Sequence, residues 1–260
     1  MTASAGGAPA KPVGDGELVA AYEDGRTAED RQVQDFLGGN QVLEDVARYA
    51  SARIALPQDV PLTGASCGEP NAFWSEQDRS MTFCYELVEQ IRPLFLEQQT
   101  EGTAEQREAL ADEDVVGMAN GVILHELGHA LVDLYDLPVT GKEEDAVDQL
   151  SVLLLTAGDE EHTAYAVSTV NALSGLARAE LAGQLPAEAY ADEHSLDAQR
   201  FYNQVCWLFG SDPGTFASVV QVPENPDGVL PVDRAQGCEA EYDQLNSSWS
   251  TLLQPYLKIG

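Results

Sequence analysis

The sequence predicts an α+β fold that is mostly helical and carries one or two β-hairpins. Apolar residues recur at helical spacing through most of the 260 residues, as expected of amphipathic and buried helices. Two short runs rich in aromatic and β-forming residues flank the polar segment Ser75–Arg79, which is typical of a hairpin. Helices and strands do not alternate along the chain, and this argues against a parallel α/β sheet.

The first half of the chain contains predicted helices and the hairpin. Residues 1–16 are mainly Ala, Gly, Pro and Ser, so we expect residues 1–27 to form a flexible segment ahead of a single domain over residues 28–260. Spacing and the positions of Gly and Pro then indicate, in order, one or two helices in 28–53 broken at Gly38-Gly39-Asn40, a loop in 54–70, a hairpin in 71–87 and a helix in 85–99 interrupted by Pro93.

The second half is predicted to be largely helical. Residues 113–135 are strongly apolar at helical spacing, and they begin with acidic residues that suit the positive end of a helix dipole. A linker or an exposed helix precedes them in residues 100–112. Further helices are expected at 143–158, 159–184, 195–210 and 233–257, with a proline-rich loop at 222–232.

The charge of the chain excludes several classes of partner. Its 44 acidic residues against 13 Lys and Arg give a formal net charge of −31. Binding to nucleic acid and to anionic membrane surfaces both depend on clustered Lys and Arg, so neither is expected. No stretch approaches the ~20 apolar residues needed to span a bilayer. We interpret the excess of acids as a well-solvated surface.

The four cysteines indicate the compartment. Cys67 and Cys84 lie close in sequence, as do Cys206 and Cys238, and none shows the spacing of a cysteine metal site. Four cysteines allow three connectivities, of which we favour the two local pairs. Disulfides would place the protein in a secreted or periplasmic setting, with a signal peptide absent from this chain. The alternative is four buried thiols in a cytoplasmic protein.

One motif carries chemistry. His125-Glu126-Leu127-Gly128-His129 has the pattern H-E-x-x-H inside the predicted helix 113–135. Because positions i and i+4 share a helix face, the imidazoles of His125 and His129 can reach one metal ion. Glu126 lies beside them, where it can polarise a metal-bound water without being a ligand. The alternative is a pair of core or capping histidines next to an exposed Glu.

A catalytic zinc needs a third protein ligand, and an acid of the next helix is the best candidate. That helix offers Glu143, Glu144, Asp145 and Asp148. Glu144 and Asp148 are spaced i, i+4, so Glu144 can bind the metal while Asp148 holds a liganding histidine by a hydrogen bond. We favour Glu144 as the ligand, with Glu143 and Asp148 as alternatives, since Glu143 lacks a carboxylate four residues on.

The pattern H-E-x-x-H followed by E-x-x-x-D on the next helix resembles that of the gluzincin metallopeptidases. More closely, the chain resembles a bacterial metallopeptidase family classed as a domain of unknown function, in CYEL (84–87), HELGHALVDLYDLPVTGKEEDAVDQ (125–149), HSLDAQRFYNQVC (194–206) and RAQGCEAEY (234–242). The resemblance implies a zincin-like core with an H-E-x-x-H helix, a second metal-ligand helix and a small hairpin or sheet. It also implies one zinc ion per chain with His125, His129 and Glu144 as ligands and Glu126 as general base.

The predicted function is zinc-dependent hydrolysis of peptide bonds in a peptide or protein substrate. His194, which precedes a predicted helix containing Arg200 and Tyr202, is the candidate donor to the oxyanion of the tetrahedral intermediate. A capping or surface role for His194 is the alternative, and Arg200 fits a structural ion pair. Two rival functions stand beside hydrolysis. One is a catalytically inactive zinc-binding structural or interaction protein with the same fold, and the other an acidic secreted structural protein with a coincidental motif.

Overall fold

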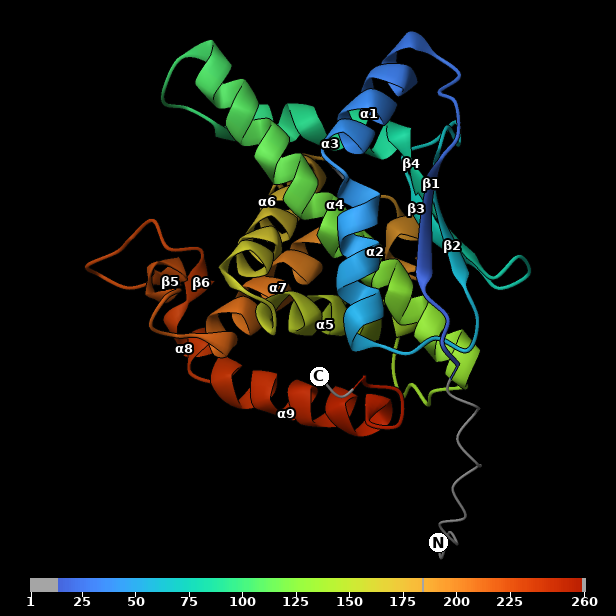
Figure 1. Ribbon diagram of the computed structural model, residues 1–260. Coiled ribbons are helices and arrows are strands. Elements are labelled where there is room, and N and C mark those ends of the chain that lie inside the picture. Colours follow the sequence, from blue (N-terminus) through green and yellow to red (C-terminus); the bar gives the residue numbers. More distant parts are fainter. Residues whose placement is uncertain (1–13, 184, 259–260) are drawn as a thin grey trace, which may run out of the picture.

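The computed structural model describes residues 14–183 and 185–258 and confirms a mostly helical α+β protein with a small sheet. In Figure 1 the sheet lies on one side of the long helix α4 (Ala104–Tyr135), and α5 (Glu143–Thr156), α6 (Glu160–Ala182) and α7 (Asp197–Ser211) lie on the other. Helices α1 (Ala28–Gly39), α2 (Val42–Arg53) and α3 (Tyr85–Gln98) pack around these layers. The predicted break at Gly38-Gly39-Asn40 separates α1 from α2.

The main sheet has four strands in the order β1-β2-β4-β3. Strands β3 (Ala72–Ser75) and β4 (Ser80–Cys84) form the antiparallel hairpin expected in 71–87. Strand β2 (Val60–Ala65) runs parallel to β4, and β1 (Leu18–Tyr22) runs parallel to β2.

Strands β1 and β2 differ from the sequence prediction, which placed residues 18–22 in a flexible segment and 54–70 in a loop. Pro61 and Gly64 within β2 are residues that usually mark loops. The sheet accommodates both, because Pro61 is exposed and Gly64 lets aromatic rings approach the strand. A Cβ at Gly64 would come within 3.0 to 3.1 Å of the rings of Tyr22 and Tyr85. The stretch 1–13 of the predicted flexible segment lies outside the described residues.

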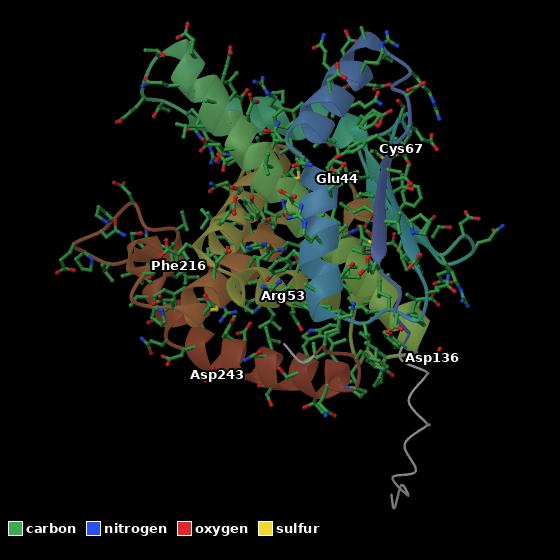
Figure 2. All side chains as sticks on the ribbon, in the orientation of Figure 1. Glu44, Arg53, Cys67, Asp136, Phe216 and Asp243 are labelled. Carbon is green, nitrogen blue, oxygen red and sulfur yellow. A yellow bond between two sulfur atoms is a disulfide. The ribbon has the colours of Figure 1, made fainter. Side chains whose placement is uncertain are left out.

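Helix α4 forms the centre of the molecule. It begins at Thr103, which closes a capping box with Gln106, so it takes in most of the stretch 100–112 that was predicted as a linker or exposed helix. It ends at Tyr135, and the next residue, Asp136, is labelled in Figure 2. Asp136 adopts a φ of +50°. By length and composition α4 could cross a membrane, but 78% of its apolar window is buried inside the molecule, as in a core helix.

The helices downstream of α4 follow the predicted ranges closely, and one glycine sets how near α5 approaches. A Cβ at Gly128 would lie 2.6 Å from the Cβ of Val147 on α5. Only glycine therefore allows this contact between the two helices. The predicted helix 233–257 is divided at Gly237 into α8 (Val232–Ala235) and α9 (Cys238–Leu253). A small parallel pair, β5 (Val220–Gln221) and β6 (Leu230–Pro231), precedes α8.

Two disulfides join the cysteines in the predicted local pairs. Cys67 bonds to Cys84, which links the loop after β2 to the end of β4. Cys206 bonds to Cys238, which links α7 to the start of α9. Both are cross-links typical of an oxidising environment.

The end of the described chain returns to its first half. The amide N–H of Ala55 donates to the carbonyl of Tyr256, and the N–H of Lys258 donates to the carbonyl of Arg53, both at 2.8 Å. The ring of Tyr256 stacks on that of Tyr135 with centroids 3.6 Å apart. Residues 253–258 thus pack against the last turns of α2 and α4.

Candidate metal centre

Helix α4 presents the histidines of the H-E-x-x-H motif from one face. His125 and His129 are one turn apart, and their ring centroids are separated by 5.1 Å at an interplanar angle of 74°. His125 is only 7% exposed, whereas His129 is half-buried. Both rings face α5, which the contact at Gly128 holds close.

Glu144, in the first turn of α5, lies between the two imidazoles. Its carboxylate oxygens are 3.1 Å from Nε2 of His125 and 3.3 Å from Nε2 of His129. The three ligand atoms offered by these residues all lie within 4.8 Å of one another. Two imidazole nitrogens and one carboxylate oxygen are a donor set that suits zinc, so these residues fit a metal ion.

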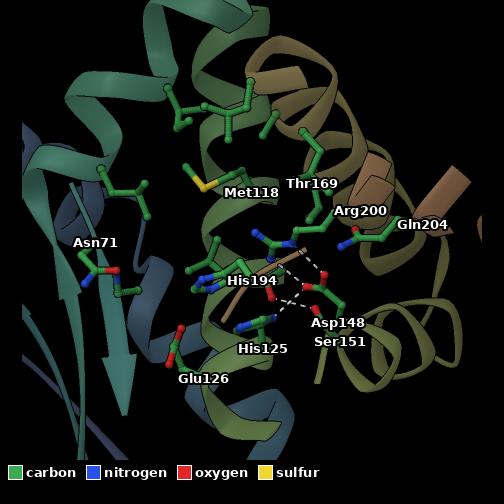
Figure 3. A pocket seen from close by; sticks show the side chains of 18 of the residues that line it. Asn71, Met118, His125, Glu126, Asp148, Ser151, Thr169, His194, Arg200 and Gln204 are labelled. Carbon is green, nitrogen blue, oxygen red and sulfur yellow. Dashed lines mark hydrogen bonds and ion pairs between the residues drawn. The ribbon is translucent and has the colours of Figure 1, made fainter. Parts of the chain in front are cut away.

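Asp148, one turn after Glu144, holds the far side of His125. Its Oδ1 lies 2.8 Å from Nδ1 of His125, which leaves Nε2 directed at Glu144. Arg200 of α7 donates to the same carboxylate through Nε and Nη2 at 2.8 and 2.9 Å (Figure 3). This two-point contact fixes the plane of the Asp148 carboxylate, and through it the orientation of the His125 ring.

Glu143 contacts Nδ1 of His129, just as Asp148 contacts Nδ1 of His125. Its Oε1 lies 2.8 Å from Nδ1 of His129, so the Nε2 atoms of both histidines face Glu144. The sequence predicts Glu143 only as an alternative ligand. Spacing of i, i+4 along one helix does not predict its contact with His129, because this contact joins two helices.

Glu126 lies beside this cluster. It is 7% exposed, and burial raises the pKa of its carboxyl group, with a backbone hydrogen bond from Trp74 of β3 acting in the opposite direction. A carboxylate with a raised pKa is a better proton acceptor than an exposed one. Strand β3 therefore helps to position Glu126 at the edge of the sheet.

The loop before α7 carries His194 to the same place. Its Nε2 lies 3.0 Å from Oε2 of Glu144, and its ring is 6.4 Å from that of His125. Lys142, next to the start of α5, donates from Nζ to the carbonyls of Asp192 and His194 at 2.9 and 3.0 Å. These two hydrogen bonds from Lys142 hold the loop that carries His194 against the start of α5.

The electrostatics of the cluster favour positive charge. Burial lowers the pKa of His125, but hydrogen bonds with Asp148 and Glu144 raise it to about 9. Burial is the largest single influence on His129 and lowers its pKa, but the contacts with Glu144 and Glu143 together outweigh it, so the pKa is raised. Burial raises the pKa of Glu144, yet the three histidines lower it well below its usual range. A divalent cation supplies the same kind of positive charge.

Two cavities open beside these residues. One, of about 290 Å³, runs along the edge strand β3 and is bounded by His129, Glu143 and His194. The other, of about 160 Å³, begins at His125 and Glu126 and extends toward α3 and α6. Glu126 lines both cavities.

The structure thus brings together every candidate from the sequence: His125, Glu126, His129, Glu144, Asp148 and His194. His162 lies outside this cluster and contacts Asp159 and the ring of Tyr49.

A family described as "Putative metallopeptidase" matches residues 22–253. The matched range includes β2, β3, β4 and all the helices that supply this cluster. No curated protein and no solved structure matches the chain.

Proposed function

The chain belongs to this metallopeptidase family, and from that membership we propose that it hydrolyses peptide bonds with one zinc ion held by His125, His129 and Glu144. The observation that carries the proposal is the convergence of two Nε2 atoms on one carboxylate, with a buried glutamate beside them. We also propose that the core is zincin-like, with α4 as its active-site helix and α5 as its second metal-ligand helix.

The donors suit zinc in number and kind, because catalytic zinc sites commonly use three protein ligands and keep one position open. When bound, zinc supplies Lewis acidity, which polarises a carbonyl group and makes water easier to deprotonate. Asp148 and Glu143 fix the tautomers of His125 and His129 by holding their Nδ1 atoms. In this arrangement each ring offers Nε2 as a lone-pair donor.

Glu126 is the proposed general base. Its carboxylate accepts a proton from the attacking water, and the water oxygen forms a bond with the carbonyl carbon of the substrate. The proton then passes from Glu126 to the amide nitrogen as the C–N bond breaks, so the carboxylate is restored. Its burial supports this role, because a carboxylate whose pKa is raised by burial accepts a proton more readily than an exposed one.

His194 is the proposed donor to the oxyanion. A hydrogen bond with Glu144 raises the pKa of its imidazole, which favours a ring that carries a proton to donate. Its side chain is 43% exposed and borders both cavities. A carbonyl oxygen of a substrate in the β3 cavity can therefore lie next to it.

The two disulfides support a secreted or periplasmic location as part of the proposal. Extracytoplasmic proteins meet oxidising conditions, in which these cross-links persist. An acidic, well-solvated surface is compatible with this setting.

Metal analysis combined with one substitution tests the proposal. Purified protein should contain one zinc per chain and cleave members of a broad peptide library. Glu126→Gln should retain the zinc and lose hydrolysis, whereas Glu113→Gln, at an exposed position of the same helix, should change neither. Bound zinc without cleavage of any peptide would favour an inactive zinc-binding protein, and absence of metal would remove the proposal altogether.

A further inference from the structure

The cavity of about 160 Å³ that starts at the candidate metal centre has the size and walls of a side-chain pocket. His125, Glu126 and His194 line it on the side of the candidate metal centre, and Met118, labelled in Figure 3, lines it as well. Most of the remaining wall is apolar: Leu87, Ile91, Val122, Leu173 and Leu176. An apolar cavity of about 150 Å³ is known to hold a benzene ring. The pocket therefore matches a six-membered aromatic ring in volume and character.

One polar group in this wall lacks a partner. Gln204 of α7 is only 2% exposed, and its Oε1 has no hydrogen-bond partner among the described residues. The other buried polar groups of the wall are satisfied, since Ser151 donates to the carbonyl of Gly121 and Asp148 is held by Arg200. A buried amide without a partner is costly, so the position of Gln204 calls for a hydrogen-bonding group that enters the cavity.

We propose that the cavity binds a tyrosine side chain next to the scissile bond, and that Gln204 recognises its phenolic hydroxyl. The hydroxyl of a phenol can donate a hydrogen bond to the unpaired Oε1 of Gln204, and its ring suits the apolar wall. Phenylalanine or leucine would fill the space but leave Gln204 unpaired. A charged side chain would lose its hydration, because Arg200 and Asp148 already neutralise each other.

The selectivity rests on the proposed function, because the proposed catalytic groups Glu126 and His194 line the cavity. Its position at Glu126 means that a ring inside the cavity holds the neighbouring peptide bond at the reacting site. The preference for tyrosine over phenylalanine comes from Gln204 alone, whose Oε1 has no hydrogen-bond partner among the described residues, the metal-ligating side chains included. Binding in the cavity can therefore be measured apart from hydrolysis.

Binding of two small probes to the full-length protein tests the assignment without any turnover. N-acetyl-tyrosinamide should bind about 2- to 10-fold more tightly than N-acetyl-phenylalaninamide in an NMR titration, as one neutral hydrogen bond provides. Gln204→Leu should bring this ratio to one or below. Tyr202→Phe, which removes a hydroxyl from an exposed position of the same helix, should leave the ratio unchanged.

Equal binding of the two probes by the wild-type protein would overturn the assignment, and this comparison requires no variant. If Gln204→Leu does not fold, Gln204→Met offers an unbranched apolar replacement of similar length. A ratio that persists in either folded variant would also overturn it.

Hydrolysis of matched peptides separates this inference from the proposed function. The peptides differ only in having Tyr or Phe at the position that flanks the cleaved bond. A preference for the tyrosine probe without cleavage of any peptide would support the tyrosine pocket and rule out the proposed peptidase activity. Cleavage with equal kcat/KM for both peptides, together with equal binding of the two probes, would support the proposed peptidase activity and rule out recognition of tyrosine by the pocket.

Discussion

Nδ1 of His125 lies 2.8 Å from Oδ1 of Asp148, so α5 orients the imidazole of a histidine that α4 supplies. Asp148 is 4% exposed, and its negative charge is balanced by the two hydrogen bonds from Arg200. Burial raises the pKa of Asp148, but Arg200 and His125 lower it below its usual range. The carboxylate thus stays ionised and keeps the Nδ1 proton of His125 in place.

Replacing Asp148 should weaken metal binding more than it weakens the fold. We expect Asp148→Asn to reduce zinc affinity about 10- to 100-fold, because the amide orients His125 less firmly and no longer raises its basicity. Competition with a chromophoric chelator measures this affinity. Asp145→Asn, on the same helix but without these contacts, should stay within twofold of the wild type. An unchanged zinc affinity in Asp148→Asn would show that Asp148 does not position His125 for metal binding.

Replacing His194 distinguishes an oxyanion donor from a ligand. As a donor, His194→Ala should lower kcat about 10²- to 10³-fold, while zinc affinity falls at most about 10- to 100-fold through the lost contact with Glu144. His162→Ala, which changes a histidine outside the cluster, serves as the control for both measurements. A loss of zinc affinity well beyond about 100-fold in His194→Ala would instead make it a ligand, as its place in a second potential metal group with Glu144 and Glu193 allows.

The contact between α4 and α5 depends on the missing side chain of Gly128. Gly128→Ala would place a methyl group 2.6 Å from the Cβ of Val147, so α5 must move away. We expect a loss of about 1–3 kcal/mol in the free energy of unfolding, together with weaker zinc binding. Gly39→Ala, at a helical position with nothing within 4 Å, should be neutral or slightly stabilising in urea unfolding. Equal effects of the two substitutions would contradict this interpretation.

Asp30 should make the stability of the fold depend on acid pH. Its buried carboxylate accepts hydrogen bonds from Ser66 and from the amides of Arg26 and Thr27, and these contacts, Ser66 foremost, lower its pKa. Because the native pKa lies below the unfolded value, the ionised group stabilises the native state above about pH 4. This contribution disappears as the pH falls through the native pKa.

We therefore expect Asp30→Asn to be less stable than the wild type by about 1–3 kcal/mol at pH 7, with a smaller difference near pH 3. Urea unfolding at both pH values measures the effect. Asp35→Asn, at an exposed position of the same helix, should show almost no difference at either pH. A deficit in Asp30→Asn that is as large at pH 3 as at pH 7 would argue against ionisation as the cause.

Local spacing predicts the parts of the site that lie on one helix. His125 and His129 share a face of α4, and Glu144 and Asp148 share a face of α5, because both pairs are four residues apart. The antiparallel return of α5 follows from the short connection between the helices. Hydrophobic periodicity likewise predicts most helices to within a few residues, since it depends only on neighbours in sequence.

Contacts between distant segments are beyond such reasoning. The pairing of Glu143 with His129 depends on the angle at which α5 crosses α4, and that angle is set by the close contact at Gly128. Strand β1 forms because residues 60–65 offer it a parallel partner about forty positions away. Its own composition contains no sign of this pairing, and Pro61 and Gly64 in its partner suggest a loop.

The backbone hydrogen bonds that join residues 256–258 to residues 53–55 bear on how the protein matures. The ring of Tyr256 covers Tyr135 at the end of the helix that carries both histidines. A chain that emerges one residue at a time from a ribosome or an export channel cannot complete the packing around this helix until residues 253–258 are free. Packing of residues 253–258 against α2 and α4 should therefore precede completion of the proposed metal site.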